Sequence, residues 1–281
     1  MYTAIIFLAL LGVGYEASAL ALRFPSMKPS LVTKNPKEFS QLASTSPEAV
    51  EDTSLILKGS ITTQSESLPV VSRERLSNFF RNPAFRNLLV SGGGERPVEE
   101  VDVTEDLLED WKAQCKSHGV ELPDDNDSIL SVVSRGIEFP GLKVKSTATV
   151  GVKFVEKENI APRHEFVLLA TQEKASGLPP VVWIYNKLTG ADKKDNASDN
   201  SKAKSLSTVT YEATEDGKVK FRTNSFLQIG ITFPKVLLKI LPSDKATIEE
   251  KASSSIEKTL MKDVVHSMKA YAQAYSKEMH L

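Results

Sequence analysis

The side chains that most often carry catalysis are spread thinly along this chain of 281 residues. The histidines lie far apart, with no pair at the spacing of helical zinc ligands: His118, His164, His266 and His280. No Gly-x-Ser-x-Gly elbow is present, and the neighbouring Glu249 and Glu250 would point in different directions on a helix. We therefore assign no catalytic residue, metal ligand or cofactor, and we expect a protein that is not an enzyme.

Two short motifs resemble ligand loops but lack their chemistry. The glycines of residues 91–94 are followed by "ERPVEE", whose acids would repel a phosphate, so this stretch is interpreted as a turn. The stretch "PDDNDS", residues 123–128, lacks the glycine and the closing glutamate of an EF-hand loop. It is interpreted as a solvated turn.

Composition narrows the classes of partner. The formal net charge of −1 gives no general attraction to nucleic acid, and we expect no such partner. Hydrophobic residues make up 41% of the chain, which suits a folded domain with a sizeable core. Cys115 is the only cysteine, so no disulfide can form within the chain, and we interpret its thiol as a packing residue.

One aromatic cluster lies in the stretch "PPVVWIYNKLTG". Trp183 and Tyr185 can form a lip over a ligand cavity, or they can pack the end of a sheet. The sequence leaves both interpretations open.

The N-terminal residues have the features of targeting signals. The apolar run of residues 4–13 is too short to cross a bilayer but has the length of a signal-peptide core. Ala17-Ser18-Ala19 and the overlapping Ala19-Leu20-Ala21 offer cleavage sites after Ala19 or Ala21. Residues 1–21 are therefore predicted to be a signal peptide. Residues 22–68 are predicted to be a transit peptide and a disordered linker, because they begin basic, rich in hydroxyls and poor in acids.

This combination resembles the bipartite presequence of algae with complex plastids. It predicts delivery to a plastid (chloroplast) through the secretory pathway, with plain secretion as the alternative. No transmembrane span is expected in the mature chain.

Residues 69–128 are predicted to form a helical and acidic segment. Residues 73–90 have a helical pattern that Pro83 must break or kink. Thr104 can cap a second helix, which ends near His118 and is closed by Gly119. Acids outnumber bases from Glu95 to Asp127, so this stretch is a candidate surface for a protein partner.

After residue 129 the hydrophobic period changes to an alternating one. Strands are predicted at 142–154, 165–173, 205–213, 218–223 and 226–233, with a further short strand at 54–57. Asp216-Gly217 predicts a hairpin, and Asn224-Ser225 a second reversal. Consecutive strands favour an antiparallel meander. The polar residues 190–204 are predicted to be a mobile surface loop.

A long helix with one apolar stripe is predicted at the C-terminus, after a short turn bracketed by prolines. A capping box of Thr247 with Glu250, or of Ser254 with Glu257, would start it. About 30 helical residues span roughly 45 Å, which is long enough to cross a sheet. The stripe consists of residues three or four apart: Ile248, Ala252, Ile256, Leu260, Val264, Met268, Tyr271 and Tyr275.

The stretch "LQIGITFPKVLLKILPSDKATIEEKASSSIEKTLMKDVVHSMKAYAQAY" has a strand ending in proline, a second "LP", a short connection and a long helix ending near tyrosine. It resembles an uncharacterised plastid and cyanobacterial domain family that is similar to the START-like, helix-grip, lipid-binding superfamily. The resemblance covers residues 129–279. It implies an α+β fold, in which an antiparallel β-sheet grips a long C-terminal α-helix, here with an N-terminal helical segment.

In the usual START-like order two short helices follow the first strand, whereas both helices predicted here precede most of the strands. Residues 129–281 are expected to form the sheet and the C-terminal helix. A ligand cavity would lie between the two, and its candidate residues are Trp183, Tyr185, Leu260, Val264, Met268 and Tyr271.

Two functions stay open at this point. The resemblance implies a non-catalytic protein that binds a hydrophobic small molecule, a lipid or a pigment, in a plastid. The alternative is a structural or assembly factor with a fully packed core that binds a protein partner. A cavity for a drug-sized ligand has about 300 to 1,000 Å³, so the interior volume distinguishes the two.

Overall fold

The computed structural model describes residues 54–133, 137–139, 142–157, 160–189, 201–214, 216–232 and 244–281. The predicted signal peptide, the N-terminal part of the predicted transit peptide and the proline-bracketed turn lie outside these residues. The helices are α2 (Arg73–Arg81), α3 (Pro83–Val90), α4 (Glu105–His118), α5 (Pro179–Thr189) and α7 (Lys245–Met279). The strands are β1 (Ser54–Gln64), β2 (Leu68–Pro69), β3 (Val98–Val101), β4 (Ser128–Val133), β5 (Ile137–Phe139), β6 (Leu142–Lys157), β7 (Ile160–Gly177), β8 (Ser201–Ala213) and β9 (Lys218–Thr232).

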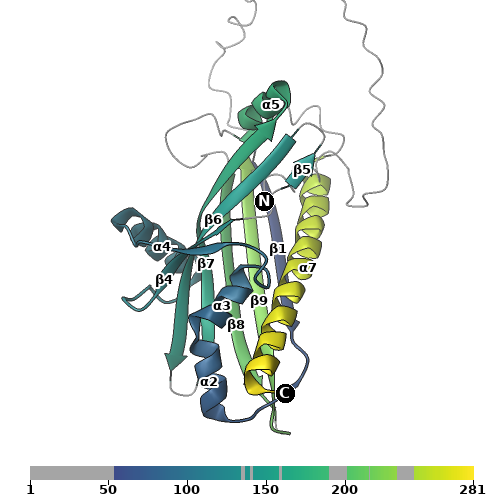
Figure 1. Cartoon of the computed structure of the whole chain (residues 1–281). Helices are drawn as coiled ribbons and strands as arrows, with labels where there is room; N and C mark the ends of the chain where they lie inside the picture. Colours follow the sequence, from purple (N-terminus) through teal and green to yellow (C-terminus); the bar gives the residue numbers. More distant parts are fainter. Residues whose placement is uncertain are drawn as a thin grey trace, which may run out of the picture.

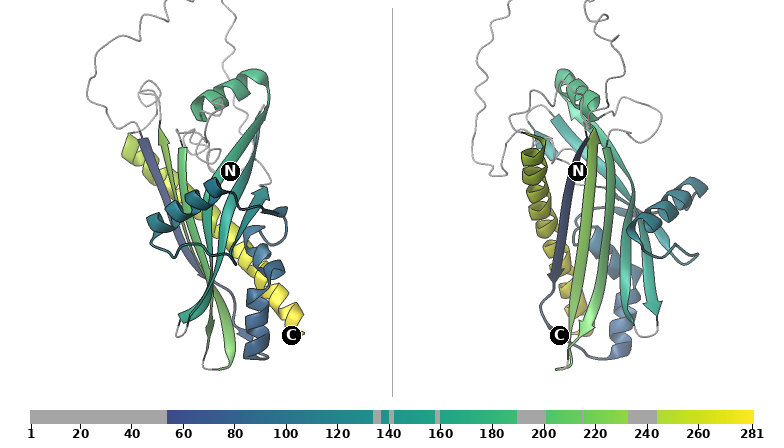
Figure 2. Two further views of the ribbon diagram at one scale, coloured as in Figure 1. Left: turned by 90° about the vertical axis from the view of Figure 1, so that its left-hand side faces the viewer. Right: turned by 180° about the vertical axis from the view of Figure 1, so that it is seen from behind.

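One large curved sheet holds the long helix α7 against one of its faces (Figure 1). The strand order is β1-β9-β8-β7-β6-β4-β3, and the run from β6 to β9 is the predicted antiparallel meander. α2 and α3 cover the same face beside the C-terminal half of α7, whereas α4 lies on the opposite face (Figure 2). The fold is therefore α+β with helix-grip architecture, as the sequence predicted.

The first strand of this fold lies in the predicted linker. Eleven residues of β1 pair antiparallel with β9, from Ser54 opposite Thr232 to Gln64 opposite Arg222. α2 and α3 come after β1, so the pair of short helices follows the first strand, as in the usual helix-grip order. Strands on both sides of residue 129 belong to one sheet, so the predicted boundary there does not separate two structural units.

The predicted reversal at Asn224-Ser225 is wrong, because β9 runs through it without a break. The two side chains simply point to opposite faces of the strand. Asn224 accepts a hydrogen bond from the hydroxyl of Thr62 at 2.9 Å on one face, while Ser225 is buried on the other. The predicted turn at Asp216-Gly217 is present, with Gly217 at a φ of 71°.

Local signals placed most helix ends correctly. Asn82 ends α2 and caps α3, so Pro83 breaks the predicted 73–90 helix in two. Thr104 caps α4, and Gly119 closes it in the left-handed conformation. Both predicted capping boxes of α7 are wrong, because the helix starts earlier: the carboxylate of Asp244 accepts from the Thr247 N–H at 3.0 Å. The predicted 190–204 loop is also too long, since β8 begins at Ser201.

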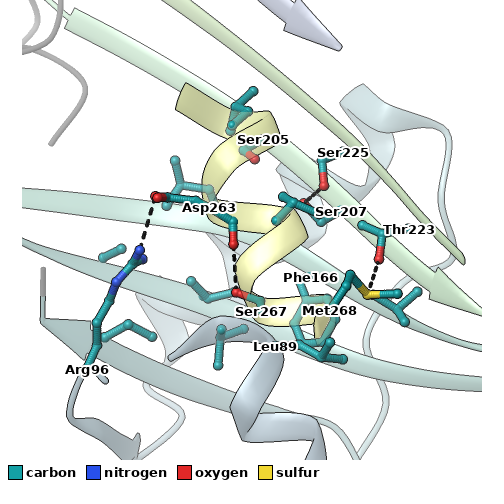
Figure 3. A pocket seen from close by; sticks show the side chains of 18 of the residues that line it. Leu89, Arg96, Phe166, Ser205, Ser207, Thr223, Ser225, Asp263, Ser267 and Met268 are labelled. Atoms are coloured by element: carbon teal, nitrogen blue, oxygen red, sulfur yellow. Dashed lines mark hydrogen bonds and ion pairs between the residues drawn. The ribbon is translucent and has the colours of Figure 1, made fainter. Parts of the chain in front are cut away.

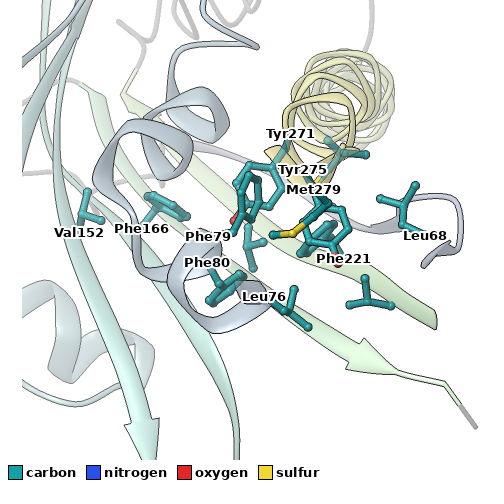
Figure 4. Packing of buried hydrophobic residues seen from close by; sticks show 14 of the residues in the cluster. Leu68, Leu76, Phe79, Phe80, Val152, Phe166, Phe221, Tyr271, Tyr275 and Met279 are labelled. Atoms are coloured by element: carbon teal, nitrogen blue, oxygen red, sulfur yellow. The ribbon is translucent and has the colours of Figure 1, made fainter. Parts of the chain in front are cut away.

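Two apolar clusters pack α7 onto the sheet. The C-end core lies under the C-terminal half of α7 and includes α2 (Figure 4). Its buried members are Leu68, Leu76, Phe79, Phe80, Leu130, Val152, Phe166, Val209, Val219, Phe221, Met268, Tyr271, Ala272, Tyr275 and Met279. The N-end core lies under the N-terminal half of α7 and consists of Leu55, Leu57, Leu227, Ile229, Ile248, Ala252 and Ile256. Between them Leu260 and Val264 of the same stripe are only half-buried, so the packing of α7 on the sheet is looser there.

The sheet edge formed by β1 is covered by polar side chains of α7. The backbone N–H groups of Ile56, Lys58 and Ser60 donate to side chains of α7. Their acceptors are Glu249 (2.7 Å), Ser253 (3.0 Å) and Glu257 (3.3 Å). The donors are two residues apart on β1, which is about 6.6 Å along a strand, and the acceptors are four residues apart on α7, which is about 6 Å along a helix. The two spacings therefore match. Gly59 allows the close approach, since a Cβ there would lie 2.8 Å from Cγ2 of Ile256.

The outer face of the sheet has its own small core beneath α4. Trp111 and Cys115 of α4 pack on Ile129 and Val167, and Cys115 is buried, as expected for a packing residue. Within the described residues, no helix combines the length and apolar composition needed to cross a bilayer.

Candidate functional site

A cavity of about 200 Å³ lies between the sheet, α3 and α7, where the two apolar clusters are separated (Figure 3). Its lining combines apolar side chains with hydroxyls and one ion pair. The lining residues are Leu89, Val90, Arg96, Val132, Ala148, Val150, Phe166, Leu168, Ser205, Ser207, Val209, Thr223, Ser225, Ile256, Thr259, Leu260, Asp263, Val264, Ser267 and Met268.

The cavity exists because small hydroxyl side chains take inward positions on two neighbouring strands, β8 and β9. On β9 the inward residues read Phe221, Thr223, Ser225 and Leu227, so two small polar residues stand between large apolar ones. On β8 the serines at 205 and 207 take the corresponding places. A leucine or phenylalanine at these positions would fill the space with side-chain volume. The sequence thus leaves space in the interior beside these residues of β8 and β9.

The hydroxyls make few hydrogen bonds with one another. Ser207 Oγ donates to Ser225 Oγ at 2.9 Å, and Thr223 Oγ1 donates to the sulfur of Met268 at 2.9 Å. On α7, Thr259 and Ser267 donate to the carbonyls of Ser255 and Asp263, both at 3.0 Å. The cavity is therefore lined by hydroxyls from both the sheet and the helix.

An ion pair lines the cavity beside α7, and a glycine turn packs against this pair and the helix. Arg96 donates to the Asp263 carboxylate at 3.1 Å, and both side chains are partly buried. The guanidinium lies against Gly92, where a Cβ would stand 3.1 Å from the Arg96 Nε. The neighbouring Gly93 is equally close to α7, since a Cβ there would meet Ala270 at 2.8 Å. The glycine stretch is thus a turn, as predicted, and the structure shows in addition that it packs on α7.

Three of the six predicted cavity residues line this cavity: Leu260, Val264 and Met268. Tyr271 does not line it, because its ring is buried in the C-end core, with centroids 5.0 Å from Phe79 and 4.9 Å from Phe221. Trp183 lies on α5 at the end of β7 and is 61% exposed, so it neither lines the cavity nor packs the sheet end. Tyr185 belongs to the same helix, but its side chain lies outside the described residues.

The polar lining was missed by the sequence reasoning. Ser205, Ser207, Thr223, Ser225 and Arg96 were not candidates. The available signal was a pair of hydroxyl residues two apart on each of two neighbouring strands. The predicted reversal at Asn224-Ser225 concealed it, because it put Thr223 and Ser225 on different strands.

The titratable groups with the most altered environments lie elsewhere. His164 is 1% exposed in the C-end core, and burial lowers its pKa to about 4. Burial also raises the pKa of the Cys115 thiol and of the Asp127 carboxyl on the outer face. Within the described ranges, no cluster of three or more His, Cys, Asp or Glu side chains is arranged to hold a metal ion.

A buried polar cluster pins the acidic segment to the outer face of the sheet. Lys153 is 6% exposed, donates to the Leu122 carbonyl and lies 3.8 Å from the Asp127 carboxylate. Its cross-strand partner Glu165 is 1% exposed and accepts from Arg163 at 2.7 Å. The acids of α4 point outward into solvent, and their role as a partner surface stays a prediction.

The chain matches no family model and no curated protein. It is similar to a conserved protein of Geobacillus kaustophilus, with 11% identity, a TM-score of 0.33, and coverage of 78% of this chain and 97% of that one. It is also similar to the Zhui aromatase/cyclase of Streptomyces sp. R1128 (9% identity, TM-score 0.32, coverage of 79% and 94%). A third similar structure is norcoclaurine synthase of Thalictrum flavum, with 11% identity, a TM-score of 0.27, and coverage of 84% of this chain and 99% of that one. TM-scores this low support no transfer of function.

Proposed function

We propose that this protein binds a small hydrophobic molecule in the cavity between the sheet and α7 and does not transform it. The observation that carries the proposal is the cavity itself, which lies where Leu260 and Val264 of the apolar stripe are only half-buried. Protein interiors are close-packed and seldom contain voids larger than a water molecule. A volume of about 200 Å³ is well above the space that one water needs. It therefore favours the binding protein over a fully packed assembly factor.

The size of the cavity restricts the ligand. Drug-sized ligands occupy about 300 to 1,000 Å³, so this cavity holds a smaller molecule. A single acyl chain or a single ring system suits the volume, whereas a large pigment or a two-chain lipid requires movement of α7 or of the glycine turn. We propose a lipid-like compound of the smaller kind.

The proposal is binding rather than catalysis. As far as the described residues define it, the lining offers hydroxyls and an ion pair but no histidine, cysteine or lysine. Among the described residues, the guanidinium of Arg96 and the carboxylate of Asp263 bond each other and no lining hydroxyl, and Ser267 bonds only the backbone carbonyl of Asp263, so no nucleophile is paired with a base here. Binding in a plastid remains part of the proposal, and it depends on the targeting features of the N-terminus.

The experiment that tests the proposal compares two neighbouring valines of α7. Val264 lines the cavity, whereas Val265 is 46% exposed on the solvent side. We expect Val264→Phe to fold with a melting temperature within a few degrees of the wild type, because the added atoms enter empty space. It should retain much less hydrophobic material after incubation with a total lipid extract, and Val265→Phe should retain as much as the wild type.

Retained compounds are identified by solvent extraction and mass spectrometry of the re-isolated proteins.

The contradicting outcome is a filled core, in which overpacking typically lowers the free energy of unfolding by about 1 to 3 kcal/mol. A strongly destabilised Val264→Phe variant, together with wild-type protein that retains nothing, would contradict the proposal and favour the packed assembly factor.

A further inference from the structure

The polar side of the cavity has an arrangement that defines the chemistry of its ligand. Ser207 of β8 and Ser225 of β9 are direct cross-strand partners. Ser205 lies two residues before Ser207 and Thr223 two residues before Ser225, so all four hydroxyls face the same side. They form a diagonal band across two neighbouring strands, visible in Figure 3 beneath α7. We call these four residues the hydroxyl band.

The hydroxyl band keeps hydrogen-bond donors available. Ser207 and Ser225 share one hydrogen bond, so one of their two protons remains undonated, whichever serine is the donor. The Thr223 proton meets a thioether sulfur, which is a weak acceptor. Ser225 is 4% exposed and Thr223 is 3% exposed, so bulk water does not satisfy these groups freely. A buried donor without a good acceptor is costly, and an oxygen atom in the cavity would remove that cost.

The opposite wall is different. Thr259 and Ser267 of α7 donate their protons to carbonyls of their own helix, four residues earlier. They present only oxygen lone pairs to the cavity. The sheet therefore offers donors and the helix offers acceptors, which fits a group that accepts from the sheet.

The charges of the lining cancel. Arg96 and Asp263 pair with each other at 3.1 Å, so a neutral ligand leaves the pair intact. An anionic ligand could reach the guanidinium only by displacing the carboxylate of Asp263, and a cationic ligand would have to displace Arg96. Either exchange leaves a partly buried charge without its partner, which is unfavourable.

We infer that the ligand is a neutral molecule with an apolar body and one oxygen acceptor, such as a carbonyl, ether or hydroxyl, and that this oxygen lies against the Ser207–Ser225 pair. The inference rests on the proposed function and adds the chemical class of the ligand. It also predicts discrimination against the same apolar body carrying a carboxylate or an ammonium group.

The test uses probes that share one chain length and differ at one end: octane, octanol, octanone, octanoate and octylamine. Their affinities for the wild-type protein are measured by titration calorimetry and checked by native mass spectrometry. We expect octanol and octanone to bind about tenfold or more tightly than octane, octanoate and octylamine.

The matched variants are Ser207→Ala with Ser225→Ala, and Thr208→Ala as the control. Removing both serines deletes the hydrogen-bonding pair together, which is close to neutral for stability. We expect the double variant to keep its affinity for octane and to lose the preference for octanol. Thr208 is one residue along the same strand and faces the other side of the sheet, so its variant should keep that preference.

The outcomes separate the inference from the function on which it rests. If octane binds as tightly as octanol, or octanoate binds most tightly, the ligand class is wrong and the binding function stands. A preference for octanol that survives in the double variant also overturns the inference. If none of the probes binds and Val264→Phe retains the same lipids as the wild type, the binding function fails, and the ligand class with it.

Discussion

A neutral histidine lies within the aromatic part of the C-end core. The ring of His164 has centroid distances of 4.6 Å to Phe80 and 5.1 Å to Phe154. Its Nε2 is 2.6 Å from the Phe80 carbonyl oxygen, so Nε2 carries the proton and donates. Burial lowers its pKa to about 4, against the opposing effect of that hydrogen bond, and the charge of Arg86 lowers it further.

This histidine makes stability depend on pH. The unfolded chain binds a proton at His164 below about pH 6.5, whereas the folded protein binds it only near pH 4. Between these values the unfolded state holds more protons, so the free energy of unfolding decreases as the pH falls. A difference of about 2.5 pKa units corresponds to about 3 kcal/mol, fully present above pH 6.5 and lost by about pH 4.

Urea unfolding of the wild type and of His164→Phe across this pH range measures the effect. We expect the free energy of unfolding of the variant to fall by about 3 kcal/mol less than that of the wild type between pH 6.5 and pH 4. The comparison is needed because burial also lowers the pKa of His118, which acts in the same direction. Equal slopes for the two proteins would show that His164 does not titrate as inferred.

At the scale of single residues, the sequence predicted the helix side of the cavity better than the sheet side. Leu260, Val264 and Met268 could be found because a helical stripe has a fixed period. Thr223 and Ser225 could not, since the face of a strand residue depends on an unbroken register along the strand. One false turn in β9 was enough to hide both.

At the scale of elements, α4 is held to the sheet by one close contact and a set of buried charges. The indole of Trp111 lies directly on Gly151 of β6, where a Cβ would stand 2.3 Å from Cε2 of the indole. A rigid, fully buried ring cannot yield to such a contact. The absence of a side chain at Gly151 is therefore what allows α4 to pack here.

We expect Gly151→Ala to cost about 1 to 3 kcal/mol in the free energy of unfolding, as overpacking does. In the double variant with Trp111→Leu the penalty should be smaller than the sum of the two single changes, because the smaller side chain makes room. Denaturant unfolding measures both. The other tryptophan, Trp183, is exposed, so in a Trp183→Phe background the emission reports Trp111 alone.

Octanol binding serves as the control for this prediction. We expect Gly151→Ala to bind octanol as the wild type does, since α4 and the cavity lie on opposite faces of the sheet. Additive single and double variants, or an unshifted Trp111 emission in Gly151→Ala, would mean that the contact is not tight in solution.

At the scale of the whole molecule, the sequence predicted the sheet and the long helix but not that β1 and the two short helices belong to the same fold. The meander and the long helix follow from local patterns and from short connections. The pairing of β1 with β9 joins residues that are 158 to 178 positions apart in the chain, from Gln64 with Arg222 to Ser54 with Thr232, and no local pattern encodes it. For the same reason the helix pair α2 and α3 could be predicted as helices but not placed after the first strand.

The subcellular localisation of the protein is also a property of the whole molecule. We expect residues 1–53, which end directly before β1, to carry a fused fluorescent reporter into the plastid of an alga with a complex plastid. Replacing Leu20 and Phe24 by alanine should divert part of the reporter, because a large apolar residue is expected at the signal–transit junction. Fluorescence microscopy shows the location of both reporter fusions, and reporter found only in the medium or the secretory pathway would indicate secretion instead.

The contacts between β1 and α7 have a consequence for the time course of synthesis. The acceptors for the N–H groups of Ile56, Lys58 and Ser60 lie 193 to 197 residues later in the chain. A ribosome adding about 5 to 20 residues per second needs roughly 10 to 40 s to make that length. The first strand lacks its complete neighbour in the sheet until Thr232 is made, and it lacks the helix that covers its edge until α7 is made. A nascent or truncated chain without its C-terminal helix therefore exposes an open strand edge to other chains, and aggregation is the expected fate of such fragments.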